Sequence, residues 1–402
     1  MKDFENKARA YALKNAVSHG GKSAQGAVIS ALFNEGLKKE EVVKYAKKVF
    51  EIVNEINKLS IEQQEKEFEK LKDAVSERPH REGLPELPNV PKTGVIMRFA
   101  PSPSGAFHIG HAMTGCISFD YVMKYGGKFY VRIEDTNPEN IYEPAYKMIE
   151  EESKWLFNKK AIIVVQSDRM KLYYNYAEKL IKKGFGYVCT CPSEKFKKFV
   201  DAKKDCPCRK LEIKEQLERW KNMLNKSDYN EGEAVLRFKS NMKHKNPAMR
   251  DFPLARINLT EHPKQKKKYR VWPLMNLSVT VDDIELGMTH VIRAKEHRDN
   301  AERQKMICKC LGLEKKFPWT AFLGRYKFID MELSATKITQ GIKDGKYSGW
   351  DDPSLPTIAA LKKKGYKPEA FWKFAEQVGL SESDKVMEKK EYFNLLDTFN
   401  RI

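Results

Sequence analysis

The segment RFAPSPSGAFHIGHA, residues 98–112, constrains the fold more than any other stretch of this sequence. It joins an apolar run, GVIMRF, to a run of helical character, AMTGCISFDYVMKYGG. We expect a strand before the segment and, after it, a helix that ends at Gly126 and Gly127. A turn of proline, glycine and serine residues at a helix start lets backbone N–H groups face an anion. The segment therefore predicts an anion-binding turn between a strand and a helix.

Two histidines stand at the end of this turn, in the sequence HIGH. His108 and His111 lie three positions apart, which places both imidazoles on one face of a helix start. Gly110 has no side chain and leaves room for a flat ligand beside the backbone. Two imidazole donors, the positive helix end and the open glycine suit a nucleoside triphosphate. The alternative is a pair of surface or metal-binding histidines.

The alternation of strand and helix continues beyond this segment. KFYVRIEDTNPE predicts a strand over Phe129–Glu134, and AIIVVQSDR predicts an all-apolar strand of the kind that is buried in a parallel sheet. KLYYNYAEKLIKKGFG predicts a helix that stops at a glycine. Such alternation indicates an α/β fold with a doubly wound parallel sheet.

The pattern divides the 402 residues into five parts. We expect a helical N-terminal appendage that ends in a linker rich in proline and glycine, two halves of the parallel sheet, an insertion between those halves, and a mainly helical C-terminal part. In chain order, these parts are 1–92, 93–186, 187–270, 271–330 and 331–402, with the insertion at 187–270.

Seven cysteines occur in the chain, and four of them form two C-x-C pairs separated by fourteen residues. Two such pairs can close a tetrahedral four-thiolate site for structural Zn²⁺, and the alternative is four free thiols. The pairs are Cys189 with Cys191 and Cys206 with Cys208. We expect the other three, Cys116, Cys308 and Cys310, to be core residues.

The charge is strongly positive, with 74 Lys and Arg against 55 Asp and Glu, a net charge of +19. Because this charge is spread along the chain, it favours a folded protein that binds a polyanion. Lysine runs at 195–198 and 362–364 are candidates for contacts with nucleic acid phosphates, although each could equally be a solvated face. The charged N-terminus and the lack of an apolar run of membrane length predict a cytoplasmic protein with no membrane partner.

Taken together, RFAPSPSGAFHIGHA, YVRIEDTNPE, VVQSDRMKLYYNYAEKLIKKG, VDDIELGMTHVIRAKEH and YSGWDDPSLPTIAALKKKGYKPEAF resemble class I aminoacyl-tRNA synthetases. RFAPSPSG is similar to glutamyl-tRNA synthetases, whereas glutaminyl enzymes tend to carry a Pro-Glu-Pro-Asn version. ALKNAVSHGGKSAQGAV, near the N-terminus, resembles the archaeal form. The resemblance implies a Rossmann-like catalytic domain that is split by an acceptor-binding insertion carrying structural Zn²⁺.

The resemblance also implies an activity. Such enzymes join L-glutamate to AMP, using ATP with Mg²⁺, and pass the glutamyl group to the 3′ end of tRNA. Archaeal members continue into two β-barrels that read the anticodon, and LLDTFNRI ends the chain near the point where these would begin. A truncation, a separate anticodon-binding chain and the absence of such a domain stay open, as does charging of the tRNA for glutamine.

The resemblance assigns the amino-acid site residue by residue. Arg98 and Arg293 match the arginines that face the glutamate carboxylates, Glu134 matches the residue that meets the amino group, and Ser102 matches a neighbouring polar contact. Met275 departs from the family, which usually has a tyrosine there. A thioether cannot donate the hydrogen bond of a phenol, so either another group orients glutamate or glutamate is held more loosely.

The second ATP signature of the family, Lys-Met-Ser-Lys-Ser, lies near MELSATKI. Aligning its serine with Ser334 puts Ala335 in the place of the lysine that stabilises the transition state. Either Lys337 replaces that lysine, with help from the hydroxyls of Ser334 and Thr336, or these hydroxyls and the helix start suffice. A lost activity is the third reading. We expect His108, His111 and Lys337 to be the catalytic groups.

Two rival functions remain at this point. One is a truncated relative that attaches glutamate to a modified base in a tRNA anticodon. The other is a catalytically idle tRNA-binding protein, suggested by Ala335 and Met275.

Overall fold

The computed structural model describes residues 3–76, 83–225, 228–331 and 333–401. It divides into two compact units, 1–81 and 82–402. Part of the expected linker, residues 77–82, and Glu332 of the second signature lie outside the described residues. No helix in the described ranges has both the length and the apolar character that a membrane crossing needs.

The first unit is helical, as the apolar spacing predicted. Its helices are α1 (Phe4–Ser18), α2 (Gln25–Asn34), α3 (Val42–Ile56) and α4 (Ile61–Leu71). Helix α1 contacts all three others. Its buried alanines, among them Ala8, Ala12 and Ala16, let the neighbouring backbones come close. Ser60 begins α4 with a reciprocal capping box to Gln63.

The second unit is built on parallel strands, which confirms the predicted α/β class. Strand β2 lies between β1 and β3, and β8 pairs in parallel with β9. The backbone N–H of Thr289, just before β8, donates to the carbonyl of Ile96 in β1 at 3.0 Å, so the two sheets adjoin. These strands are β1 (Val95–Phe99), β2 (Gly127–Ile133), β3 (Ala161–Val165), β8 (His290–Ala294) and β9 (Trp319–Leu323).

The expectation that the AIIVVQSDR strand is buried was wrong. This strand, β3, is parallel to β2 but forms the edge of its sheet, where Ile162 is exposed. An apolar run does not by itself distinguish a central strand from an edge strand.

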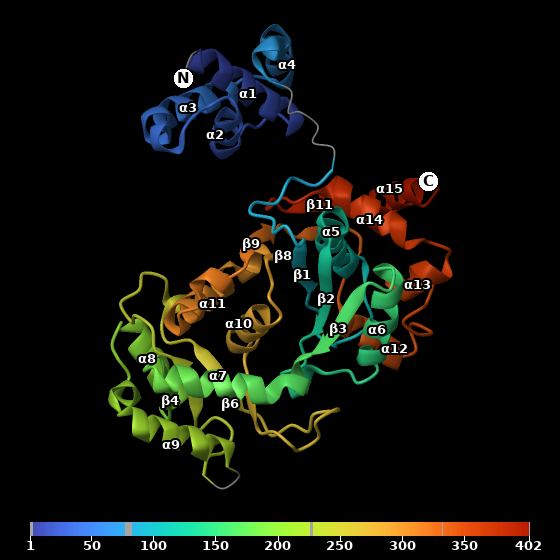
Figure 1. Cartoon of the computed structure of the whole chain (residues 1–402). Helices are drawn as coiled ribbons and strands as arrows, with labels where there is room; N and C mark the ends of the chain where they lie inside the picture. The colour runs from blue at the N-terminus through green and yellow to red at the C-terminus, as the bar shows by residue number, and fades with distance from the viewer. Residues whose placement is uncertain (1–2, 77–82, 226–227, 332, 402) are drawn as a thin grey trace. The chain divides into compact units, whose positions relative to one another are not determined.

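Helices cover the parallel sheet, and further helices make up most of the C-terminal part (Figure 1). Helix α5 packs on β1, β2 and β8, and α14 packs in turn on α5. Two short parallel strands, β10 (Tyr326–Phe328) and β11 (Lys385–Met387), interrupt the helices of the C-terminal part. The helices outside the insertion are α5 (Ile109–Tyr125), α6 (Ala145–Leu156), α7 (Met170–Lys182), α10 (Met275–Glu285), α11 (Arg298–Leu311), α12 (Ala335–Lys343), α13 (Ile358–Lys363), α14 (Pro368–Val378) and α15 (Lys389–Arg401).

The segment between the two sheets forms an antiparallel sheet of four strands with two helices, drawn in green to yellow in Figure 1. Its core continues into α7, α10 and α11. Its strands and helices are β4 (Gly186–Cys189), α8 (Ser193–Asp201), α9 (Ile213–Leu224), β5 (Val235–Phe238), β6 (Pro253–Ile257) and β7 (Val271–Pro273). Strand β7 thus extends this sheet three residues beyond the expected bound at 270.

The insertion contacts the turn that follows β2. His262, fully buried between β6 and β7, stacks on Trp272, and its Nε2 lies 3.0 Å from the carbonyl oxygen of Asp135 and 3.3 Å from its carboxylate. Further along the same turn, the Asn258 amide donates to Glu139 at 3.2 Å. The insertion therefore contacts the segment that directly follows Glu134.

Candidate active site

The HIGH turn joins β1 to α5 as expected. His108 precedes α5, and its Nδ1 accepts the Gly110 backbone N–H at 3.1 Å. The backbone N–H of His108 donates to Nδ1 of His111 at 3.3 Å, and the two rings stack with centroids 3.8 Å apart. Because each Nδ1 accepts a hydrogen bond, each neutral ring carries its proton on Nε2. The turn thus presents two imidazole N–H donors.

Both histidines are neutral at pH 7. Burial lowers the pKa of His108 to about 4. Burial also lowers the pKa of His111 well below its ordinary value, and the neighbouring His108 adds to this effect. The pair therefore acts on a ligand through hydrogen bonds and the helix end rather than through positive charge.

Gly105 is required by close approach, and the space beside Gly110 is narrower than the sequence predicted. A Cβ on Gly105 would lie 2.2 Å from the indole ring of Trp350, so only glycine fits there. A Cβ on Gly110 would lie 3.1 Å from the His108 ring and 3.3 Å from the side chain of Leu333. The C-terminal part is thus packed directly against the HIGH turn.

The second signature lies beside the first. Leu333 contacts the HIGH turn, and Ser334 begins α12 with its hydroxyl accepting the Lys337 backbone N–H at 3.4 Å. Ala335 is the first residue of α12, and the side chains of Thr336 and Lys337 are exposed. The buried Ile338 joins α12 to Ala106 of the turn.

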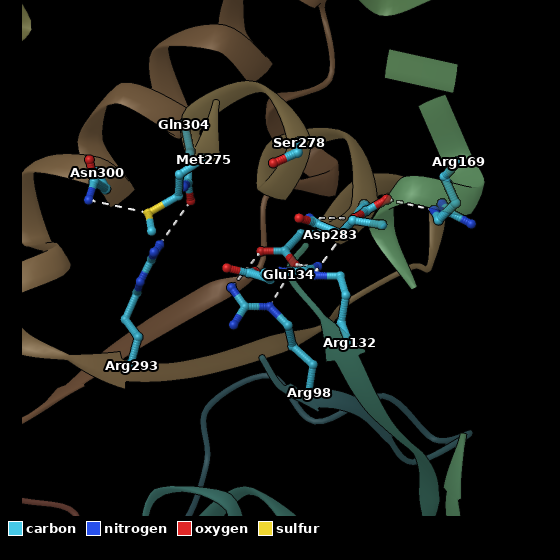
Figure 2. A network of polar contacts seen from close by, with 12 residues as sticks. Arg98, Arg132, Glu134, Arg169, Met275, Ser278, Asp283, Arg293, Asn300 and Gln304 are labelled. Carbon is cyan, nitrogen blue, oxygen red and sulfur yellow. Dashed lines mark hydrogen bonds and ion pairs between the residues drawn. The ribbon is translucent and has the colours of Figure 1, made fainter. Parts of the chain in front are cut away.

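A buried network of arginines and carboxylates lies at the ends of β1 and β2 (Figure 2). Arg98 binds Asp283 of α10 through Nε at 2.7 Å and Nη2 at 3.1 Å. Arg132, two positions before Glu134 on β2, donates to Asp283 at 2.6 Å and to Glu134 at 2.9 Å. Burial opposes ionisation of Asp283, but the two guanidinium groups lower its pKa to about 2. Asp283 is therefore ionised and paired with both arginines.

A second carboxylate of α10 also has hydrogen-bond and ion-pair partners. Asp282 is fully buried and accepts from Gln166 at 2.9 Å, Arg169 at 2.7 Å and Tyr173 at 2.8 Å. These partners follow β3 or lie on α7, so Asp282 joins α10 to the first half of the sheet.

Arg293, at the end of β8, differs from the other arginines of the network. Its Nη1 donates to the side-chain oxygen of Gln304 at 2.9 Å, and no carboxylate of the described residues forms an ion pair with it. Burial, together with repulsion from Arg98, lowers the pKa of Arg293 to about 10, so it is still charged at neutral pH. Its Nε has no hydrogen-bond partner among the described residues.

Three of the four residues expected to bind glutamate come together here, namely Arg98, Glu134 and Arg293. Ser102 lies on the turn after β1 with an exposed side chain. Met275 begins α10, is 36% exposed, and its sulfur accepts from the Asn300 amide at 3.5 Å.

Sequence reasoning missed several polar residues of the site. Arg132 could have been found, because a spacing of two places it on the same face of β2 as Glu134. Asp282 and Asp283 form an adjacent acidic pair within a helix that is otherwise buried, which is itself a signal for buried ion pairing. No local pattern distinguishes Gln304 from an ordinary polar residue of α11.

The four expected metal ligands also come together. Cys189 ends β4 and Cys191 follows it, whereas Cys206 precedes the short helical turn Pro207–Lys210 and Cys208 lies within it. Their sulfurs all lie within 4.8 Å of one another. Neighbouring sulfurs are 3.6 Å apart for Cys189 and Cys206, 3.4 Å for Cys191 and Cys206, and 3.9 Å for Cys191 and Cys208. A tetrahedron with zinc–sulfur bonds of about 2.3 Å places sulfurs about 3.8 Å apart, so this donor set fits Zn²⁺.

The other cysteines follow the expectation in part. Cys116 and Cys308 are buried, but Cys310 is only half-buried. The reason is that the C-x-C spacing on α11 turns the two side chains to different faces.

A parallel sheet whose first turn presents two neutral imidazoles beside a buried arginine pocket is typical of a class I nucleotide-dependent synthetase. Comparison with known protein families agrees: residues 94–399 match the model for tRNA synthetases class I (E and Q), catalytic domain, and the chain belongs to this family. The chain is 45% identical to the glutamate–tRNA ligase of Pyrococcus horikoshii over 396 residues, which is 95% of this chain and 68% of that protein. It is 43% identical to the glutamate–tRNA ligase of Methanocaldococcus jannaschii, with the same shares.

Solved structures agree on the fold. A glutamate tRNA ligase from Elizabethkingia meningosepticum superposes with a TM-score of 0.52 at 19% identity, covering 75% of this chain and 68% of that one. The glutamate–tRNA synthetase of Elizabethkingia anophelis gives 0.53 at 20%, covering 75% and 69%. The expected family, Rossmann-like fold and glutamate–tRNA ligase activity are thereby confirmed.

Proposed function

We propose that this chain activates L-glutamate with ATP to glutamyl-adenylate, releases pyrophosphate, and transfers the glutamyl group to the 3′ end of tRNA, with Arg98, Glu134 and Arg293 in contact with the amino acid. The observation that carries the proposal is that the buried guanidinium of Arg293 forms no ion pair with a carboxylate of the described residues. Arg98, Arg132 and Arg169 each pair with a carboxylate of the chain, and Arg293 pairs with an amide.

The charge balance of the pocket favours glutamate over glutamine. Free glutamate carries two carboxylates and one ammonium group, a net charge of about −1, which matches the charge of the Arg293 guanidinium, for which the described residues supply no carboxylate partner. Glutamine has no second carboxylate and would leave Arg293 buried and uncompensated, which costs several kcal/mol. Glu134 supplies the negative charge for the ammonium group, and Arg132 fixes its carboxylate at 2.9 Å.

The ATP phosphates bind at the start of α5 in this proposal. The neutral imidazoles of His108 and His111 donate to phosphate oxygens, and Gly110 lies between them at the positive end of the helix. The exposed side chains of Thr336 and Lys337, together with Ser334, face the same substrate from the second signature. Mg²⁺ enters with ATP as part of the substrate. Catalysis then consists of aligning the carboxylate with the α-phosphate and stabilising the charge that develops there.

We propose further that residues 187–270 bind the tRNA acceptor arm, between catalytic halves 93–186 and 271–330. The four thiolates hold a structural Zn²⁺, and four protein ligands leave no open position for chemistry on the metal. The Arg219 guanidinium lies 3.7 Å from the Cys208 sulfur, which favours a thiolate there. Lysines such as Lys195 and Lys362 contact phosphates without reading bases.

A pyrophosphate-exchange assay with glutamate, ATP and added tRNA tests the function. We expect glutamate-dependent exchange, and glutamyl ester at the 3′ end of the tRNA for glutamate. The tRNA for glutamine serves as a second acceptor. Label on an anticodon base would instead support the base-modifying relative, and no exchange under any condition would support the idle tRNA-binding protein.

A further inference from the structure

Gln304 lies behind Arg293 and is the described side chain to which the Arg293 guanidinium donates. We propose that Gln304 is a positioning residue: its amide oxygen orients the guanidinium without neutralising it, so that the positive charge is kept for the side chain or α-carboxylate of glutamate. This inference rests on the proposed function and adds to it the residue that keeps the pocket's charge open.

The contact is close and well shielded. Gln304 is 2% exposed on α11, Arg293 is 8% exposed on β8, and 2.9 Å separates Nη1 from Oε1. A neutral acceptor fixes one edge of the guanidinium plane but cancels none of its charge. In contrast, Arg98 and Arg132 both form ion pairs with carboxylates, which fix the arginine side chains and also neutralise their charge.

The surrounding polar atoms also favour a ligand at this place. Among the described residues, three buried side-chain atoms on β8, α10 and α11 have no hydrogen-bond partner: Nε of Arg293, Nε2 of Gln304 and Oδ1 of Asn276. A buried polar atom that stays without a hydrogen bond destabilises the folded chain. Two of these atoms belong to the Arg293–Gln304 pair itself, so each side chain of the pair keeps a donor available for a polar ligand.

The side chain at position 304 therefore determines the charge that the pocket offers. A glutamine and a glutamate have the same shape, but a glutamate at this position would form an ion pair with Arg293. The pocket would then contain four guanidinium groups and four carboxylates, and the substrate's net negative charge would lose its counterpart.

The decisive experiment compares Gln304→Glu with Gln304→Met in the pyrophosphate-exchange assay with tRNA. For Gln304→Glu we expect the KM for glutamate to rise about 100-fold, because the charge is cancelled, while the KM for ATP stays within about threefold. Gln304→Met keeps the length and the charge but has no oxygen acceptor, so we expect a rise of about tenfold. Glu302→Gln, on the exposed face of the same helix, is the matched control.

The two variants keep the test decisive if one of them folds poorly. A glutamate KM unchanged in the folded Gln304→Glu protein overturns the inference, and so does an unchanged KM in Gln304→Met. Equal loss for glutamate and ATP would show a merely structural role and also overturns it. If the unmodified chain itself shows no glutamate-dependent exchange, the proposed function fails instead, so the two failures are distinguishable.

Discussion

Arg98 presents two guanidinium nitrogens to the single carboxylate of Asp283, at 2.7 and 3.1 Å. The pair joins β1 to α10, elements that are far apart in the chain. Since Arg132 also reaches Asp283, the three groups fix the ends of two strands against one helix. The pocket is therefore preorganised before any substrate enters it.

Asp283→Asn tests the contribution of this pair to stability. The substitution leaves two buried guanidinium groups without their shared carboxylate, so we expect the free energy of unfolding to fall by about 3–5 kcal/mol. Urea unfolding followed by circular dichroism measures the change. Glu302→Gln, an exposed control, should stay within about 0.5 kcal/mol of the unmodified chain. An Asp283→Asn protein as stable as this control would show that the pair is not a stabilising contact.

Cys206→Ser tests the metal site. We expect one zinc per chain in the unmodified protein and loss of most of this zinc in the variant, because a hydroxyl replaces one of four thiolates. Elemental analysis of the purified proteins measures the content. Cys310→Ser, a half-buried cysteine outside the cluster, should retain the metal. Equal zinc in both variants would be incompatible with a Cys₄ site.

Lys337→Ala tests whether this lysine replaces the one that Ala335 has displaced. Removing one group that stabilises transition-state charge costs about 100-fold in rate, so we expect kcat of pyrophosphate exchange to fall by about that factor. Lys343→Ala, in the last turn of the same helix, is the control. A normal rate in Lys337→Ala would leave the hydroxyls of Ser334 and Thr336 and the start of α12 as the stabilising groups.

Glu152→Gln tests a buried carboxyl behind the HIGH turn. Burial raises the pKa of Glu152 from 4.5 to about 8, although the Phe107 N–H that it accepts opposes the rise. A group with a raised folded-state pKa contributes stability that is complete below its unfolded pKa and is lost as pH rises through the folded one. The loss within this window is about 1.4 kcal/mol per pH unit.

The measurement is the unfolding free energy of both proteins between pH 5 and pH 8. We expect the stability of the unmodified chain relative to Glu152→Gln to decrease as pH rises, since glutamine cannot ionise. Parallel curves would mean that Glu152 is ionised in the folded chain throughout this range.

The sequence predicted those features that depend on local chemistry. The end of α5 at Gly126, the parallel strands β1 and β2 and the gathering of the four cysteines follow from glycine, apolar runs and cysteine spacing. The edge position of β3 was not predictable, because an apolar run has the same pattern in a central strand and in an edge strand.

The balance between guanidinium and carboxylate charges at the site could not be predicted from local sequence patterns either. Which guanidinium is paired depends on where α10 and α11 meet the sheet, and this is decided by tertiary packing. Arg98 and Arg293 look equivalent in the sequence, yet one faces a carboxylate and the other an amide.

His262 of the insertion contacts the residue that follows Glu134 in the chain. It holds Asp135, and one peptide bond separates Asp135 from Glu134. The antiparallel sheet is therefore connected to the Glu134 carboxylate through a single peptide unit. In the proposed function, in which Glu134 binds the ammonium group and residues 187–270 bind tRNA, this peptide unit lies directly between the two binding regions.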